Sequence, residues 1–146
     1  MGYKKVVLVG TLLFVQSAIA ADWVTIAAPT WPPQEGADYY VEVDGSSIRM
    51  RDGYRQAWVR YSYARPQLAS YGLSYKSVTQ LQILDCKNEE TANMEVIYYN
   101  EKFSLGGVVH SFSVTRSEAV KLLKPVLPQT LGETVLLWTC GQKSKQ

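Results

Sequence analysis

The residues able to carry out covalent or redox chemistry are few in this chain of 146 residues. It contains two cysteines, Cys86 and Cys140, which lie far apart in the sequence. Redox-active pairs usually have the form Cys-x-x-Cys, and a zinc site needs about four ligands. Neither pattern is present, so in a protein exported from the cytoplasm the pair most simply forms one structural disulfide.

A catalytic site would need a base beside a nucleophile, or two carboxyl groups held at a set separation. The single histidine, His110, lies in a strand-like run, and we expect it to be a surface or half-buried strand residue. Glu89 and Glu90 are adjacent, and neighbours on an extended chain point apart. No glycine loop of the kind that cradles phosphate occurs in the sequence. The sequence therefore predicts a protein that is not an enzyme and that has no metal site and no cofactor.

Arginine and tyrosine side chains form the best candidate for a binding surface. Both types are enriched where proteins recognise proteins, because they bury area and keep a polar group. Asp52 is the only acid between positions 49 and 65, so this region is locally basic. The candidate residues are Arg49, Arg51, Arg55, Arg60, Arg65, Tyr54, Tyr61 and Tyr63, with Tyr71 and Tyr75 further along the chain. The alternative is that the tyrosines pack in the core of a sheet while the arginines form its solvated face.

The first 20 residues match a secretory signal peptide. Lys4 and Lys5 precede an apolar run, which ends at the A-x-A pattern of residues 18–20. The run is shorter than the about 20 residues that a membrane span needs. No cysteine follows this pattern to carry a lipid. We therefore expect residues 1–20 to be removed and residues 21–146 to form one exported domain without a membrane anchor.

The charge of the mature domain is balanced. The whole chain has a formal net charge of +2. The signal carries two of its 15 basic residues, which leaves 13 basic and 13 acidic residues in the mature domain. Nucleic-acid-binding domains usually carry a clear basic excess, so we expect no nucleic-acid partner.

Most of the mature sequence predicts short β-strands between turn residues. The expected strands are residues 23–26, 39–43, 48–51, 55–63, 75–86, 94–99 and 108–114. Asp52-Gly53 between two of these predicts a tight hairpin turn, and residues 65–72 are expected to form a loop. Connections this short predict antiparallel pairing, because parallel strands need longer crossovers.

The end of the chain carries two helix-capping patterns. Residues 115–118 fit a capping box, so a short helix is expected over residues 119–124, ending at the next proline. Residues 130–133 fit a second box. The apolar run that follows, up to Cys140, would then be a helix ended by a glycine, but it also fits a buried strand.

Short pieces of the mature sequence, taken in order and spacing, resemble a known family. The pieces are Tyr40-Val41-Glu42-Val43-Asp44, Ser46-Ser47-Ile48, Trp58-Val59, Asp85-Cys86, Tyr98-Tyr99, Gly107-Val108-Val109, Lys124-Pro125-Val126-Leu127-Pro128-Gln129-Thr130, Gly132-Glu133 and Cys140. From Trp23 to Cys140 the chain resembles the surface-adhesin protein E-like domain of Gram-negative bacteria. The resemblance implies a single α+β domain, mainly an antiparallel sheet, with a C-terminal helix tethered by the Cys86–Cys140 disulfide. It therefore favours the helix for the last segment.

The same resemblance implies a non-enzymatic, exported binding module that adheres to a host extracellular-matrix protein. The arginine-rich surface would also suit an anionic glycan. The alternative is a structural or accessory protein of the periplasm whose partner is another envelope protein. The expected location is the periplasm, the cell surface or the medium. Replacing Arg49, Arg51 and Arg55 together by Ser is expected to weaken binding without unfolding the domain.

Overall fold

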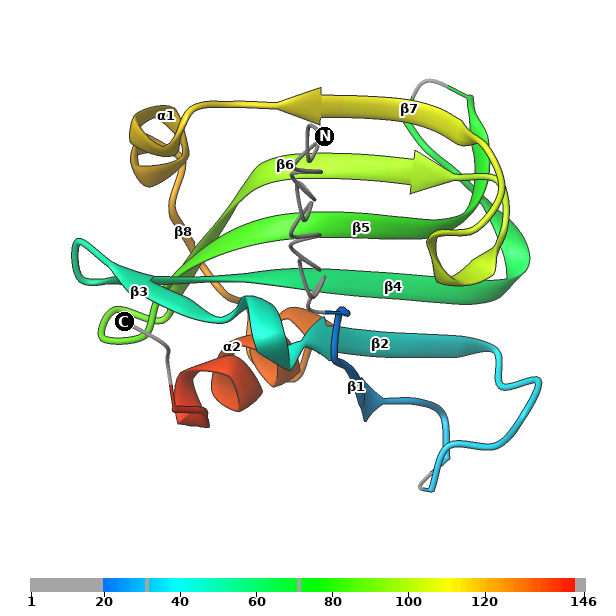
Figure 1. The fold of residues 1–146 in the computed structure, drawn as a ribbon, viewed down its shortest axis with the longest axis horizontal. Helices are drawn as coiled ribbons and strands as arrows, with labels where there is room; N and C mark the ends of the chain where they lie inside the picture. The colour runs from blue at the N-terminus through cyan, green and yellow to red at the C-terminus, as the bar shows by residue number, and fades with distance from the viewer. Residues whose placement is uncertain (1–19, 31, 71, 144–146) are drawn as a thin grey trace, which may run out of the picture.

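The fold is given by a computed structural model that describes residues 20–30, 32–70 and 72–143 (Figure 1). The expected signal peptide, apart from Ala20, and the candidate residue Tyr71 lie outside this part of the chain. The strands are β1 (Trp23–Ala27), β2 (Tyr39–Asp44), β3 (Arg49–Arg51), β4 (Tyr54–Leu68), β5 (Ser74–Asp85), β6 (Glu90–Tyr99), β7 (Val108–Ser113) and β8 (Lys124–Pro125). The helices are α1 (Arg116–Lys121) and α2 (Leu131–Gly141).

The strands form one antiparallel sheet, as the short connections predict. Six of them follow one another in the order β1-β2-β4-β5-β6-β7. β3 continues the line of β2 along the same side of β4, because Val43 faces Val59 and Arg49 faces Gln56. In the same way, β8 continues the line of β7 along β6. The expected α+β fold with a mainly antiparallel sheet is confirmed.

The tight turn between β3 and β4 forms at the predicted place. Asp52 and Gly53 have φ angles of 53° and 80°. A two-residue turn of this type needs positive φ at both central positions, which Asp and Gly tolerate best. Across the turn, Arg51 lies opposite Tyr54. The turn therefore fixes the pairing that places these two side chains on the same face of the sheet.

α2 packs against β1, β2 and β4 (Figure 1). The side chain of Thr130 accepts a hydrogen bond from the backbone N–H of Glu133, which fixes the start of the helix. Val135 and Leu136 of the helix are buried in one cluster with apolar residues of the sheet. The sheet residues of this cluster are Val41, Val43, Ala57, Val59 and Leu84, joined by Ile48. The last segment is therefore a helix, as the resemblance implies, and not a buried strand.

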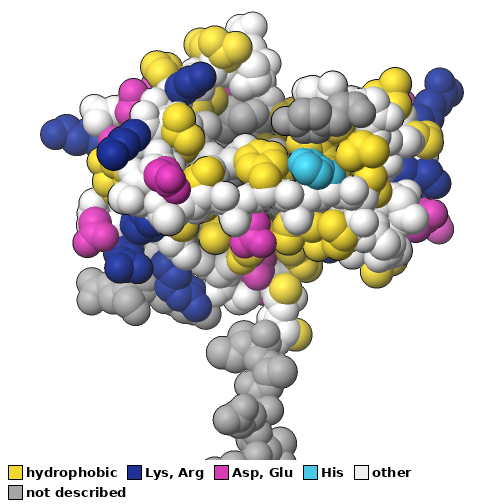
Figure 2. All heavy atoms as spheres, turned by 90° about the horizontal axis from the view of Figure 1, so that it is seen from above, with side chains coloured by type: hydrophobic (Ala, Val, Ile, Leu, Met, Phe, Trp, Pro, Cys, Tyr) yellow, Lys and Arg dark blue, Asp and Glu magenta, His cyan; other side chains and the backbone are white. Residues whose placement is uncertain are grey.

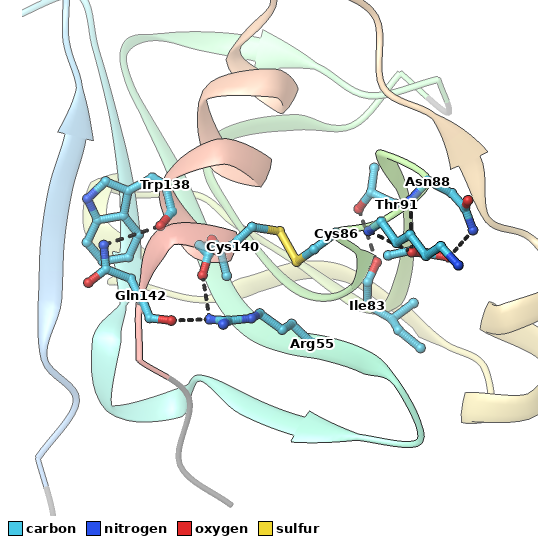
Figure 3. Close-up of a disulfide and its surroundings, with 11 residues drawn as sticks. Arg55, Ile83, Cys86, Asn88, Thr91, Trp138, Cys140 and Gln142 are labelled. Atoms are coloured by element: carbon cyan, nitrogen blue, oxygen red, sulfur yellow. Dashed lines mark hydrogen bonds between the residues drawn. A yellow bond between two sulfur atoms is a disulfide. The ribbon is translucent and has the colours of Figure 1, made fainter.

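A disulfide between Cys86 and Cys140 joins the end of β5 to the last turn of α2 (Figure 3). The sulfur atoms are 2.02 Å apart and the two Cα atoms are 5.8 Å apart, within the usual range. The predicted structural disulfide is confirmed.

Three predicted boundaries are wrong. The strand expected at residues 94–99 starts at Glu90, because a turn at residues 86–89 joins it directly to β5. Residues 65–72 are not all loop, because β4 runs on to Leu68. The pairing of β4 with β5 shifts between Ser62 and Gln67, and this irregularity accommodates Pro66 where no regular ladder bond is required.

The first helix starts earlier than the predicted range, residues 119–124. The side chain of Thr115 accepts a bond from the backbone N–H of Glu118, and the Glu118 carboxylate accepts one from the backbone N–H of Thr115. These reciprocal bonds start α1 at Arg116, and residues 124–125 form β8 instead.

No helix of the described residues is long and apolar enough to cross a membrane.

Candidate functional site

The sheet has two faces, which we call the helix face and the open face. Alternate residues of a strand point to opposite sides, so β4 contributes one set to each face. On the helix face, against which α2 packs, these are Arg55, Ala57, Val59 and Tyr61. On the open face these are Tyr54, Gln56, Trp58 and Arg60.

The eight predicted surface residues are divided between the two faces. Arg55, Tyr61 and Tyr63 belong to the helix face. Tyr54 and Arg60 belong to the open face, together with Arg49 and Arg51, which lie opposite Gln56 and Tyr54. Arg65 is exposed beyond the shift in β4. Because consecutive strand residues point to opposite sides, the eight residues do not form one continuous surface.

Arg55 has a structural role at the end of α2 (Figure 3). One of its terminal nitrogens donates a hydrogen bond of 2.9 Å to the carbonyl oxygen of Thr139, and the same nitrogen also donates to the carbonyl oxygen of Gln142. The last carbonyls of a helix lack partners within the helix and carry partial negative charge, which a cation stabilises. The triple replacement of Arg49, Arg51 and Arg55 would therefore also loosen α2, and a clean test of the surface leaves Arg55 in place.

The tyrosines of the helix face contact one another across the strands. The ring centroids of Tyr63 and Tyr75 are 6.2 Å apart, those of Tyr75 and Tyr98 are 4.9 Å apart, and both pairs meet edge-on. Burial raises the pKa of Tyr61 to about 12. Burial, and then the neighbouring Tyr75, also raise the pKa of Tyr63. On this face the tyrosines thus pack within the sheet, as the alternative prediction has it.

Arg60 is held in place on the open face. Its Nε donates a hydrogen bond of 2.7 Å to the Glu42 carboxylate, and a terminal nitrogen donates one of 3.0 Å to the carbonyl of Phe103. Its guanidinium carbon lies 4.1 Å from the centroid of the Trp23 ring, within the range of a cation–π contact. The side chains of Arg60 and Glu42 are only 11% and 10% exposed. The guanidinium is therefore a fixed positive charge in the sheet surface.

Beside Arg60 the open face is hollowed, and we call this site the aromatic hollow. Its volume is about 390 Å³, within the range of about 300–1,000 Å³ typical of small-molecule sites. The lining residues are Ala21, Trp23, Asp44, Trp58, Arg60, Thr79, Ile97, Tyr99 and Ser104. Large aromatic rings with a few polar groups among them are typical of ligand-binding sites.

The pairing of the strands assembles this hollow. Arg60 on β4 lies opposite both Glu42 on β2 and Thr79 on β5, and Thr79 lies opposite Ile97 on β6. A turn at Lys102–Ser104 closes one side, because the N–H of Phe103 donates to the hydroxyl of Ser62.

The sequence prediction missed the aromatic residues of the hollow. Trp58 could have been found, because it lies two positions from Arg60 and such residues share a strand face. Trp23 and Tyr99 could not, because they reach the hollow only through the pairing of strands far apart in sequence.

Two further kinds of side chain were considered in the sequence, the single histidine and possible metal ligands. His110 lies in β7 opposite Tyr98 and is half-buried, as expected. Within the described ranges, no group of three or more His, Cys, Asp or Glu side chains is placed to hold a metal ion.

A protein-family model described as surface-adhesin protein E matches residues 23–141. The chain belongs to the surface-adhesin protein E family. The match begins at the first residue of β1 and ends at the last residue of α2, so the family region contains the whole sheet and both helices. A comparison with curated protein sequences finds no match.

Two solved structures that the chain resembles are those of protein E from Haemophilus influenzae. The selenomethionine form has 16% sequence identity and a TM-score of 0.49, over 86% of this chain and 90% of that chain. Crystal form II has 19% identity and a TM-score of 0.48, over 80% of this chain and 95% of that chain. The predicted membership of the surface-adhesin protein E family is thus confirmed by the family match.

Proposed function

We propose that this protein is an exported, non-enzymatic adhesin whose open face recognises a host extracellular-matrix protein or an anionic glycan. Membership of the surface-adhesin protein E family supports an adhesin-like role. The recognition surface would be centred on the aromatic hollow and would extend along β4 toward the hairpin that carries Arg49, Arg51 and Tyr54.

The aromatic hollow is the observation that carries this proposal. Trp, Tyr and Arg dominate binding hot spots, because they bury large areas and keep a polar group. The hollow combines Trp58 and Tyr99 with Arg60, which Glu42 already holds in position. A preformed site loses less conformational entropy when a ligand binds. The open face therefore offers an ordered surface of the residue types that binding favours.

Export is the second part of the proposal. Residues 1–20 would be a signal peptide and residues 21–146 the mature domain. Ala20 and Ala21 are exposed, whereas the backbone N–H of Asp22 already donates to the Asp44 carboxylate. The carbonyl of Asp22 also accepts a bond from Gly45. Cleavage after Ala20 would leave these anchoring bonds intact.

The binding test compares the protein with Trp58→Ala and Tyr99→Ser on immobilised matrix proteins and acidic glycans. Both variants shorten side chains of the hollow, and we expect each to weaken binding at least about tenfold, the usual loss at a hot spot. Leu137→Ala is the matched control, because Leu137 is exposed on α2. Full binding by folded Trp58→Ala and Tyr99→Ser would remove the hollow from the proposal.

The location test treats intact cells with an external protease and releases the periplasm in parallel by osmotic shock. Digestion on intact cells supports the adhesin. Full protection, with release by shock, would instead favour a periplasmic accessory protein whose partner lies in the cell envelope.

A further inference from the structure

A second hollow lies at the other end of the open face, and we call it the basic cleft. It opens between the β3–β4 hairpin and α1, two segments that are far apart in the sequence. Its volume is about 460 Å³. The lining residues are Arg51, Asp52, Tyr54, Arg116, Ser117, Val120 and Lys121. The aromatic hollow and the basic cleft share no lining residue.

The cleft carries excess positive charge. Arg51, Arg116 and Lys121 bring three cations to it, and Asp52 brings the single carboxylate. Lys and Arg side chains gather at the end of the molecule that carries α1, on the left of Figure 2. Cations that converge on a small hollow from two separate segments raise the local concentration of anions there.

Arg116 is held in place by its contacts with the β3–β4 hairpin. One terminal nitrogen donates a hydrogen bond of 2.9 Å to the side-chain oxygen of Gln56, and the other donates one of 2.7 Å to the carbonyl of Arg51. Its Nε lies 3.8 Å from the Asp52 carboxylate, and its side chain is 16% exposed. These contacts occupy at most three of the five N–H groups of a guanidinium. The remaining donors of an ordered arginine suit the oxygens of an anionic group.

Asp52 holds these cations only loosely. Its carboxylate is 3.4 Å from Nε of Arg51 and 3.8 Å from Nε of Arg116, both longer than the about 2.7–2.9 Å of a close charged hydrogen bond. The side chain of Asp52 is 72% exposed, so it can turn into solvent without losing buried contacts. A ligand anion can therefore take its place between the two arginines.

We propose that the basic cleft is an anion-binding subsite for an acidic polysaccharide, holding one sulfate or carboxylate group of the sugar chain. Tyr54 and Val120 give the cleft apolar surface against which a sugar ring can lie. Tyr54, Gln56 and Trp58 form one row along β4, and Trp58 lies about 13 Å beyond Tyr54 at the usual rise of a strand. An extended chain with repeated anionic groups can follow this row from the cleft to the aromatic hollow. The proposal rests on the proposed function, from which it takes the open face as the recognition surface and an anionic glycan as the class of ligand.

The experiment measures binding of the full chain to heparin, which is sulfated, and to hyaluronan, which carries only carboxylates. The test variant is Arg51→Gln with Lys121→Gln, since both side chains are exposed. We expect it to bind heparin at least about tenfold more weakly, as expected for the loss of charged hydrogen bonds. Asp52→Asn removes the competing carboxylate and keeps a residue that tolerates positive φ, so it should bind more tightly than the unchanged chain. Lys143→Gln is the control, because it removes a positive charge just after α2, away from the residues that line the cleft.

The proposal is supported if Asp52→Asn binds heparin more tightly and the double variant binds it more weakly, while Lys143→Gln binds it as the unchanged chain does. Binding of hyaluronan as well assigns the cleft to carboxylates, and binding of heparin only assigns it to sulfates. No heparin binding, or an equal loss in Lys143→Gln, would overturn it. The outcome is separable from that of the proposed function: Trp58→Ala would still weaken binding to a matrix protein if the cleft proposal failed.

Discussion

The guanidinium of Arg55, on the sheet, donates a hydrogen bond of 2.9 Å to the carbonyl oxygen of Thr139, in the last turn of α2. The last turn of α2 itself carries no basic residue. The sheet thus supplies the cation that a helix C-terminus favours. This contact and the Cys86–Cys140 disulfide fix the same end of the same helix (Figure 3).

Arg55→Gln is therefore expected to lower the free energy of unfolding by about 1–3 kcal/mol, the value of hydrogen bonds to a charged group. Urea unfolding followed by circular dichroism measures the loss. Arg49→Gln is the control, because Arg49 is exposed and, within the described part of the chain, donates to carbonyls of its own turn. Equal stability of the two variants would show that Arg55 does not support α2.

Removal of the disulfide should cost more. Its half-cystines are 54 positions apart, and closing a loop of this size stabilises a fold by about 4 kcal/mol in the chain-entropy model. The variant Cys86→Ser with Cys140→Ser should therefore melt roughly 10–15 °C lower in differential scanning calorimetry. A reducing agent should lower the melting temperature of the unchanged chain to a similar extent and leave that of the double variant as it is. An unchanged melting temperature in both experiments would contradict the tethering of α2.

The ion pair of Glu42 and Arg60 leads to a prediction about buried charge. Glu42→Gln leaves the guanidinium of Arg60 buried without its counter-charge, so the free energy of unfolding should fall by about 3 kcal/mol or more. Replacing both residues, as Glu42→Gln with Arg60→Met, removes the unpaired charge and should restore part of the loss. Urea unfolding of the single and double variants measures the coupling. A double variant less stable than the sum of the single changes would contradict this account.

Stability at high pH should report on Tyr61. Burial raises its pKa from 10.0 to about 12 in the folded protein, so the folded form keeps a proton that the unfolded chain releases. The contribution of Tyr61 to stability is fully present below about pH 10 and is lost as pH rises toward 12. Burial shifts the pKa of Tyr63 and of Tyr75 in the same direction.

The measurement is the urea midpoint between pH 9 and 11.5, together with the absorbance of tyrosinate in the folded protein. In Tyr61→Phe the decline of the midpoint with pH should be smaller than in the unchanged chain. Identical pH profiles would place the titration of Tyr61 near its ordinary value.

Local patterns predicted the turn and the capping residues of both helices, because each depends on neighbouring residues, although α1 starts three residues earlier than predicted. Asp52-Gly53 forms a turn through its own backbone preferences, and Thr115 caps α1 with Glu118 three positions away. The last segment shows the limit of such patterns. Its apolar residues fit a helix or a strand, and the helix is selected by the cap at Thr130 together with the tether at Cys140 and the packing of Val135.

The candidate surface could be predicted only in part, because its members depend on long-range pairing. Arg51 and Tyr54 were found from composition, and they do line the basic cleft. Arg116 was not found, since nothing near it in sequence reveals that α1 folds back to Gln56. Arg55 and Arg60 look alike in sequence, yet one caps a helix and the other lies beside Trp23 on the opposite face.

The disulfide also has a mechanical consequence. When the chain is pulled from its two ends, tension passes along the backbone to Cys86, crosses the sulfur bridge and leaves through Cys140. The residues between the two cysteines, which include β6, β7, α1 and α2 up to Thr139, lie outside this force-bearing path. Tension along the covalent path therefore passes through β1 to β5. It does not pass through the segment that contributes Arg116 and Lys121 to the basic cleft.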